Sequence, residues 1–166
     1  MQARFAALGM LLMGAIPSAV WAGGKASSQA SVTFHIETEA TDNPKMIFSQ
    51  QVNGQTRYFR RMPEISIKDL LSFNPCPSDA GGDDYGVVFK LKDNVAQRFA
   101  AITNVNQGRW LVAQINGRVV DGVLIDRQID DGFVVIWKGV ALADIKVLGA
   151  ALPRIGQEGQ KKKQKK

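Results

Sequence analysis

The stretch that decides the fold is Tyr85 to Leu152, YGVVFKLKDNVAQRFAAITNVNQGRWLVAQINGRVVDGVLIDRQIDDGFVVIWKGVALADIKVLGAAL. In residues 86–92 the side chains alternate with the two-residue period of a strand. After Asp93, which we expect to cap a helix, apolar residues recur at helical spacing as far as Ile102. The stretch therefore begins with a strand followed by a helix.

Three more strand-like runs follow this helix. Residues 109–115, 118–129 and 133–137 are β-prone, and the dipeptides Asn116-Gly117 and Asp131-Gly132 separate them. Such dipeptides supply the positive φ angles that two-residue hairpin turns need. We therefore expect the three runs to pair antiparallel through two hairpins.

The stretch ends in a second helix. Residues 142–152 place Leu142, Ile145, Leu148 and Leu152 on one stripe, and Pro153 marks the end. Together these elements predict a compact core module over 85–152. Its fold class is α+β, a largely antiparallel sheet with helices packed on one face.

The residues before this module predict further strands. Apolar and polar residues alternate in 31–38, which places His35, the only histidine, on a polar and solvated face. Residues 46–52 and 55–61 flank Asn53-Gly54, a strong signal for a β-hairpin.

The next segment predicts a short helix and a connector. Residues 65–73 carry apolar side chains at helical spacing, with Ser66 as the N-cap. Residues 74–85 are rich in proline and glycine and predict turns. Cys76 lies there as the single cysteine, so no internal disulfide can form, and we expect a partly buried, inert thiol. A reactive free thiol and an intermolecular bridge are the alternatives.

The N-terminus predicts export. Residues 1–22 join a charged start to an apolar run too short to span a bilayer, as in a secretory signal peptide cleaved near Ala22. An uncleaved anchor is the alternative. We expect a periplasmic or secreted protein in which residues 23–156 form a single domain.

The positive charge of the chain is concentrated in its last residues. The net charge is +6, and removing Arg4 with the five terminal lysines, six positive charges in all, leaves zero. These lysines are Lys161, Lys162, Lys163, Lys165 and Lys166. Residues 157–166 lack apolar side chains and predict a disordered tail that either binds anionic lipid head groups or serves as a solvated extension. Nucleic acid is not an expected partner of a neutral, exported body.

No set of reactive side chains predicts catalysis. A lone histidine without a Gly-x-Ser-x-Gly motif argues against a serine hydrolase. The adjacent carboxylates Asp83-Asp84 and Asp130-Asp131 are typical of turns. A calcium loop formed by Asp79, Asp83 and Asp84 is the alternative, although the spacing differs from the known twelve-residue loop. We expect no catalytic, cofactor or metal site, and no enzyme.

Two strands of the module carry apolar residues that point to both of their sides. Trp110 and Val112 share one side of their strand, and Phe133, Val135 and Trp137 share one side of theirs. We interpret these five residues as a candidate partner surface. The alternative is that the N-terminal half buries them. An open edge strand would also accept an extended peptide.

The module resembles a known family in the order of its motifs. The motifs are Phe99-Ala100-Ala101-Ile102-Thr103 in the helix, Gly108 to Ala113 and Ile115 to Val120 around the Asn-Gly turn, Ile125 to Ile129, Gly132, Ile136, and Leu148 to Pro153. Together they resemble the head of the first periplasmic domain of SecD, a subunit of the preprotein translocase. The resemblance covers about half of the chain after residue 22.

The resemblance implies a periplasmic module that contacts polypeptide, and it implies no residue-level site. SecD also has membrane helices, whereas no apolar segment after residue 22 of this sequence is long enough to span a bilayer. Residues 139–144 also depart from the pattern of the family. We therefore expect a non-catalytic, exported binding module for polypeptide. The alternative is a structural or adaptor protein tethered to anionic envelope surfaces by the lysine-rich tail.

Overall fold

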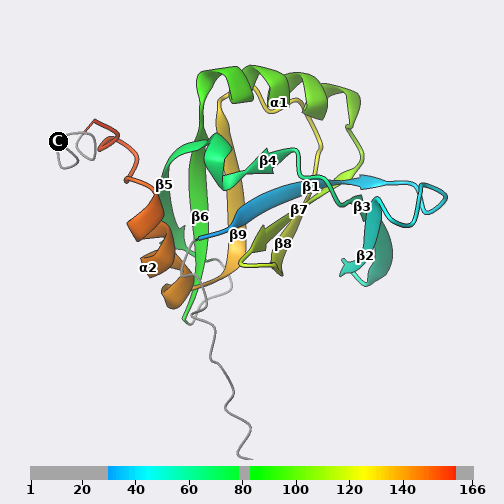
Figure 1. Ribbon diagram of the computed structural model, residues 1–166, viewed down its shortest axis with the longest axis horizontal. Helices are drawn as coiled ribbons and strands as arrows, with labels where there is room; N and C mark the ends of the chain where they lie inside the picture. Colours follow the sequence, from blue (N-terminus) through cyan, green and yellow to red (C-terminus); the bar gives the residue numbers. More distant parts are fainter. Residues whose placement is uncertain (1–29, 79–82, 160–166) are drawn as a thin grey trace, which may run out of the picture.

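The strands form two antiparallel sheets (Figure 1) in a computed structural model that describes residues 30–78 and 83–159. The first sheet has the order β2-β3-β1-β7-β8, with β4 also paired to β1, and the second has the order β5-β6-β9. The strands are β1 Val32–Thr38, β2 Ile47–Val52, β3 Gln55–Arg60, β4 Ile65–Ser66, β5 Leu70–Pro77, β6 Asp84–Leu91, β7 Trp110–Ile115, β8 Arg118–Leu124 and β9 Phe133–Ala141. The helices are α1 Asp93–Val105 and α2 Leu142–Ala151. The predicted α+β class with antiparallel pairing is confirmed, with the strands divided between two sheets.

The core lies between the two sheets. Val32, Phe34 and Ile36 of β1 face the second sheet, and Phe34 meets Phe89 of β6 edge to face at 6.1 Å between ring centroids. Each such side chain contributes about 1.5 to 3 kcal/mol of burial free energy. Figure 1 shows α1 lying across one end of the sheets and α2 beside β5. The helices therefore cover one end and one flank of the core.

Two of the three predicted hairpins are confirmed. Asn53-Gly54 joins β2 to β3 with φ angles of 50° and 75°, and Asn116-Gly117 joins β7 to β8 with 51° and 78°. The hairpin predicted at Asp131-Gly132 is wrong, because β8 ends at Leu124 and β9 pairs with β6 instead. Residues 125–132 cross from the first sheet to the second.

A buried threonine anchors this crossing to α1. Thr103 is fully buried, and its hydroxyl donates to Phe99 O at 2.9 Å while accepting from the backbone N–H of Ile129 at 2.9 Å. Phe99 and Val95 fill the core from the same helix, as predicted. Lys92, rather than Asp93, occupies the N-cap position. The path of the crossing is thus fixed by a side chain of the preceding helix.

The helix predicted over residues 65–73 is wrong. After β4 the chain makes a single 3₁₀ turn, Ile67–Asp69, and continues as β5. Ser66 does mark the start of this turn, because the Asp69 carboxylate accepts from its backbone N–H at 2.9 Å and its hydroxyl at 2.7 Å. The turn stops there because Leu70 and Phe73 are buried in pairs with Leu91 and Phe89 of β6.

The turn-rich connector predicted over residues 74–85 begins as a strand instead. Pro75 and Pro77 belong to β5, and Cys76 lies half-buried opposite Gly86 of β6 rather than in a turn. The backbone N–H of Phe73 points away from β6, because it donates to Pro153 O at 3.1 Å. Because Pro75 and Pro77 lie two and four residues after Phe73, their backbone nitrogens also point away from β6. Neither proline therefore removes a hydrogen bond to β6.

The second helix ends as predicted at the residues before Pro153. Ile145 and Leu148 are buried, whereas Leu142, predicted on the same stripe, is 49% exposed. Residues 153–155 then run beside Phe73 on the outer edge of β5. The edge of the second sheet formed by β5 is therefore covered near Phe73.

Candidate binding surface on β9

The outer face of β9 carries an apolar row. Val134 and Ile136 are buried between the sheets, so Phe133, Val135 and Trp137 point to the opposite side, as predicted. Phe133 and Val135 are half-buried, and Trp137 is 56% exposed. A bulky apolar side chain exposed to this degree beside two others makes this face a candidate site for a partner. We call the row Phe133, Val135 and Trp137 the β9 face.

The other predicted surface residues lie elsewhere. Trp110 and Val112 are on β7 in the first sheet, so the two strands do not present one common surface. Val112 is fully buried with Val52 and Phe59 under the β2–β3 hairpin, and its assignment to a partner surface is wrong. The apolar side of β7 is therefore covered by the N-terminal half of the chain.

Trp110 is half-buried beside the β2–β3 hairpin. The guanidinium of Arg57 lies over its ring, 5.1 Å from the centroid, and is held by the Glu37 carboxylate at 2.7 Å. The other carboxylate oxygen of Glu37 accepts from the backbone N–H of Trp110 at 2.9 Å. Beside the indole lies an open groove of about 360 Å³, bordered by the hairpin tip, β8 and Lys138.

The free edge of β9 is defined by its register with β6. Leu91 N–H donates to Gly132 O at 2.9 Å, and the pairing continues through Phe89 opposite Val134 and Val87 opposite Ile136. Antiparallel strands alternate hydrogen-bonded and non-hydrogen-bonded pairs. The backbone N–H and C=O of Val135 consequently point away from β6, toward the other edge.

Carboxylates bind the amides on either side of Val135. Asp131 accepts from the N–H of Phe133 at 3.0 Å, and Asp121 of β8 accepts from the N–H of Trp137 at 2.8 Å. Both bonds confirm that alternate amides of β9 face its outer edge. Asp121 is only 7% exposed and also accepts from the N–H of Gly122 at 2.9 Å, so its position is fixed.

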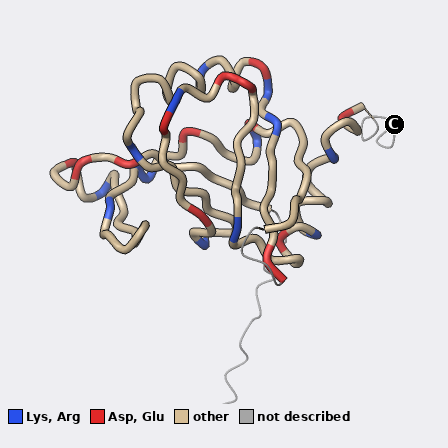
Figure 2. The backbone as a smooth tube through the Cα atoms, turned by 180° about the vertical axis from the view of Figure 1, so that it is seen from behind, with Lys and Arg blue, Asp and Glu red and all other residues tan. Residues whose placement is uncertain are grey.

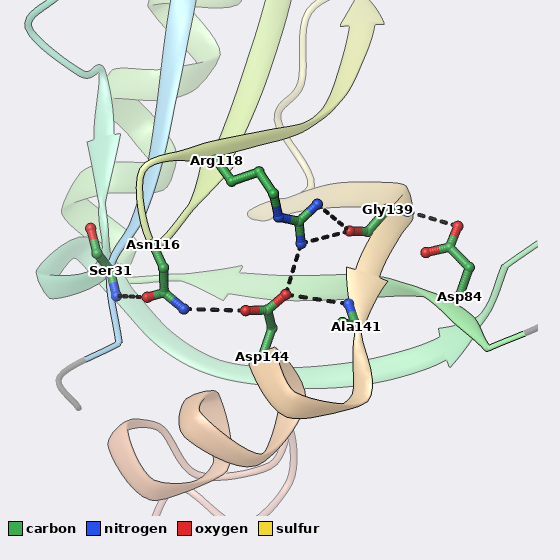
Figure 3. A network of polar contacts seen from close by, with 7 residues as sticks. All are labelled: Ser31, Asp84, Asn116, Arg118, Gly139, Ala141 and Asp144. Atoms are coloured by element: carbon green, nitrogen blue, oxygen red, sulfur yellow. Dashed lines mark hydrogen bonds and ion pairs between the residues drawn. The ribbon is translucent and has the colours of Figure 1, made fainter. Parts of the chain in front are cut away.

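A polar network closes the gap between β8 and β9 beyond Trp137 (Figure 3). Arg118 of β8 donates twice to Gly139 O at 3.1 Å and forms an ion pair of 2.9 Å with Asp144 at the start of α2. Asp144 also accepts from Asn116 at 3.2 Å, and Gly139 donates to Asp84 at 2.8 Å. These bonds tie the β7–β8 turn to the end of β9.

Gly139 lets the two strands approach each other at this point. It has a φ of +84°, and a Cβ there would lie 2.3 Å from the carbonyl oxygen of Val120. Only glycine combines this conformation with so close a contact. The edge of β9 is therefore closed by β8 at Gly139, whereas the main chain of Val135 has no hydrogen-bond partner within the described residues.

His35 is not the solvated residue that the sequence predicts. It is 5% exposed, with Nδ1 2.8 Å from Arg60 O, Nε2 2.9 Å from the Thr33 hydroxyl, and its ring edge-on to Phe48 at 5.2 Å. Burial lowers the pKa of His35, against smaller opposing effects of the Arg60 carbonyl and the Glu64 charge. The β2–β3 hairpin covers the face on which alternation places this side chain.

The remaining sequence predictions concern metals, charge and the two termini. Within residues 30–78 and 83–159, no group of three or more His, Cys, Asp or Glu is placed to hold a metal ion. Asp84 of the predicted calcium loop instead accepts from Gly139, and Asp79 lies outside the described residues. Figure 2 shows basic and acidic residues interspersed over the described chain. The predicted signal peptide 1–22 and the lysines of the tail also lie outside it, and no described helix is long and apolar enough to cross a membrane.

Comparison with known proteins gives a likeness of fold. No protein-family profile matches the sequence, and no curated protein matches it. Two solved SecDF chains match 75% of this chain with a TM-score of 0.52 and 17% identity. The first is described as a membrane component that enhances protein export, and the second is SecDF in a super-membrane-facing form. The match covers 64% and 19% of these chains, so this chain spans less than two thirds of either, and it has a SecD-like fold.

Proposed function

We propose that this chain is an exported, non-catalytic module that binds unfolded polypeptide through the β9 face, in the manner of the head of the first periplasmic domain of SecD. The observation that carries the proposal is the exposure of Trp137, 56%, in one row with Phe133 and Val135. The SecD-like fold supports it, because SecDF is described as enhancing protein export. Aromatic side chains of this kind dominate the binding energy of many protein interfaces.

Unfolded polypeptide is the partner class that the β9 face suits best. The three side chains form a narrow row along one strand, and an extended chain repeats its own side chains with the same two-residue period. The neighbouring positions on β6 are Lys90, opposite Phe133, and Val88, opposite Val135. Lys90 is itself paired with Glu158 at 3.8 Å, so the row favours apolar segments that folded proteins keep buried.

The test is binding of a permanently unfolded, carboxymethylated protein to the chain without residues 1–22. We expect Trp137→Ser to weaken binding at least about tenfold, because truncation of a central interface aromatic costs about 2 kcal/mol or more. Met62→Ser is the matched control, since Met62 is 70% exposed and lies outside the β9 face. Equal binding by the chain and its Trp137→Ser and Val135→Ser variants would overturn the proposal.

A second candidate function concerns the tail. The five lysines within residues 161–166 follow a body of zero net charge, and each lysine near an anionic membrane adds about 1 kcal/mol of attraction. Attachment to an anionic envelope surface would make the chain an adaptor. Co-sedimentation with vesicles containing anionic lipid, with and without residues 161–166, distinguishes this function from polypeptide binding.

A further inference from the structure

We infer that the bound polypeptide docks as an additional β-strand on the free edge of β9, next to Val135. This inference rests on the proposed function and specifies how it is carried out. The occupant is an extended, apolar segment with a basic residue at the end that reaches residues 126–131. Its main chain pairs with β9, and its apolar side chains lie over the β9 face.

The main chain of β9 offers an unfilled donor and acceptor at this place. The register with β6 turns the N–H and C=O of Val135 outward, and the C=O of Phe133 has the same orientation. No hydrogen-bond partner for the N–H or C=O of Val135 lies within residues 30–78 and 83–159. The alternating donors and acceptors of an extended polypeptide complement this edge.

Neighbouring groups limit the length of the edge. Asp131 holds the N–H of Phe133 and Asp121 holds that of Trp137, so the strand that docks centres on Val135. Beyond Trp137, the contact between Gly139 and Val120 brings β8 against β9. The open edge therefore accepts a short segment rather than a long sheet partner.

The side chains and charges around the edge specify the segment. In a β-pair, directly opposed side chains point to the same side of the sheet. The side chain of the docked residue opposite Val135 would therefore lie beside Val135, on the side of Phe133 and Trp137. An apolar residue is favoured there. The adjoining loop is negatively charged, because it exposes three carboxylates, Asp126, Asp130 and Asp131, and one basic side chain, Arg127. The end of the segment that reaches this loop therefore favours Lys or Arg.

The first measurement is hydrogen exchange of the Val135 amide, followed by NMR in the chain without residues 1–22. The probe is a peptide of about ten residues in which valine alternates with serine, closed at one end by lysine. We expect Val135 to exchange faster than Val134 and Ile136 in the free protein, and to be slowed at least about tenfold at saturating peptide. Binding of the peptide with no change at Val135 would overturn the inference and leave the proposed function standing.

The second measurement removes the main-chain donors while keeping the side chains. N-methylation of alternate residues on the peptide edge that would face β9 should lower the affinity of the peptide at least about tenfold, because each lost hydrogen bond lowers the affinity by about a factor of five. The same peptide methylated on its other edge is the control. On the protein, Val135→Pro removes the outward N–H at an edge position where proline is tolerated, and Val135→Ala retains it.

The outcomes separate the possible occupants. Weak binding by the first methylated peptide but not by the second, together with weaker binding by Val135→Pro than by Val135→Ala, which also shortens the side chain, supports the inference. Equal affinity of both methylated peptides overturns it. If protection of the Val135 amide from exchange rises with protein concentration in the absence of peptide, the edge binds a second copy of the chain, and the inference is also overturned. Failure of every peptide and of the unfolded protein to bind refutes the proposed function itself.

Discussion

Replacement of Gly139 by alanine tests whether the close contact between β8 and β9 holds the two sheets together. An alanine at a φ of +84° costs about 1 to 2 kcal/mol relative to glycine. Its Cβ would lie 2.3 Å from Val120 O, so the strands must separate by 0.7 Å to reach 3.0 Å, the shortest distance that real Cβ atoms keep. That separation weakens the bonds from Arg118 and to Asp84, each worth about 1 kcal/mol. The expected loss is about 3 to 5 kcal/mol of unfolding free energy.

Gly149 provides the matched control for this substitution. It lies within α2, its φ is not positive, and a Cβ there would meet no atom within 4 Å. Gly149→Ala should therefore stabilise the protein by about 0.5 to 1 kcal/mol through helix propensity. Urea unfolding followed by circular dichroism measures both variants. A Gly139→Ala loss below about 1 kcal/mol, or a larger loss in Gly149→Ala, would refute the reasoning.

Three further predictions concern stability and the tail. His35 has a lowered pKa in the folded state, so its contribution to stability is present above its unfolded pKa of 6.5 and is lost as the pH falls through the folded pKa. The urea concentration at the unfolding midpoint should therefore fall between neutral and acidic pH. A His35→Gln variant should lack this pH dependence. Thr103→Val leaves the N–H of Ile129 without its acceptor and should cost about 1 to 3 kcal/mol, whereas Thr103→Ser should keep the Ile129 amide protected in hydrogen exchange. Deletion of residues 161–166 should reduce sedimentation with anionic vesicles at low salt and leave the binding of unfolded polypeptide unchanged; loss of both activities on deletion would contradict a separate role for the tail.

Local sequence signals predict the elements of this fold well where the turn chemistry is specific. The Asn-Gly pairs at residues 53–54 and 116–117 need positive φ at both positions, and both form the expected turns. Asp131-Gly132 carries a similar signal, yet β9 pairs with β6, more than forty residues earlier in the chain. The choice of partner strand depends on contacts distant in sequence, which a dipeptide does not encode.

The error in residues 65–73 has a different origin. A short apolar run fits a helix and a buried strand equally well by periodicity. Ser66 and Asp69 do begin a helical turn, but pairing of Leu70 and Phe73 with β6 buries both residues and ends it. Tertiary contacts therefore override a correct local signal after one turn.

The candidate site was predictable in part. Alternation places Phe133, Val135 and Trp137 on one side of β9, and the structure agrees. The free edge at Val135 was not predictable, because its orientation follows from the pairing of β9 with β6. His35 and Val112 show the same limit, since alternation gives the side of the strand and cannot reveal the hairpin that covers it.

The two sheets treat their outer apolar faces differently, and this difference supports a binding role for β9. On β7, the β2–β3 hairpin covers Val112 completely and Trp110 in part. On β9, no equivalent layer within the described chain covers Trp137, although its exposed indole could gain up to about 3 kcal/mol from burial. The chain therefore covers one such face and leaves the other partly exposed, with Trp137 uncovered beside a strand edge that has no hydrogen-bond partner at Val135. An extended polypeptide satisfies both the apolar row and the edge at once.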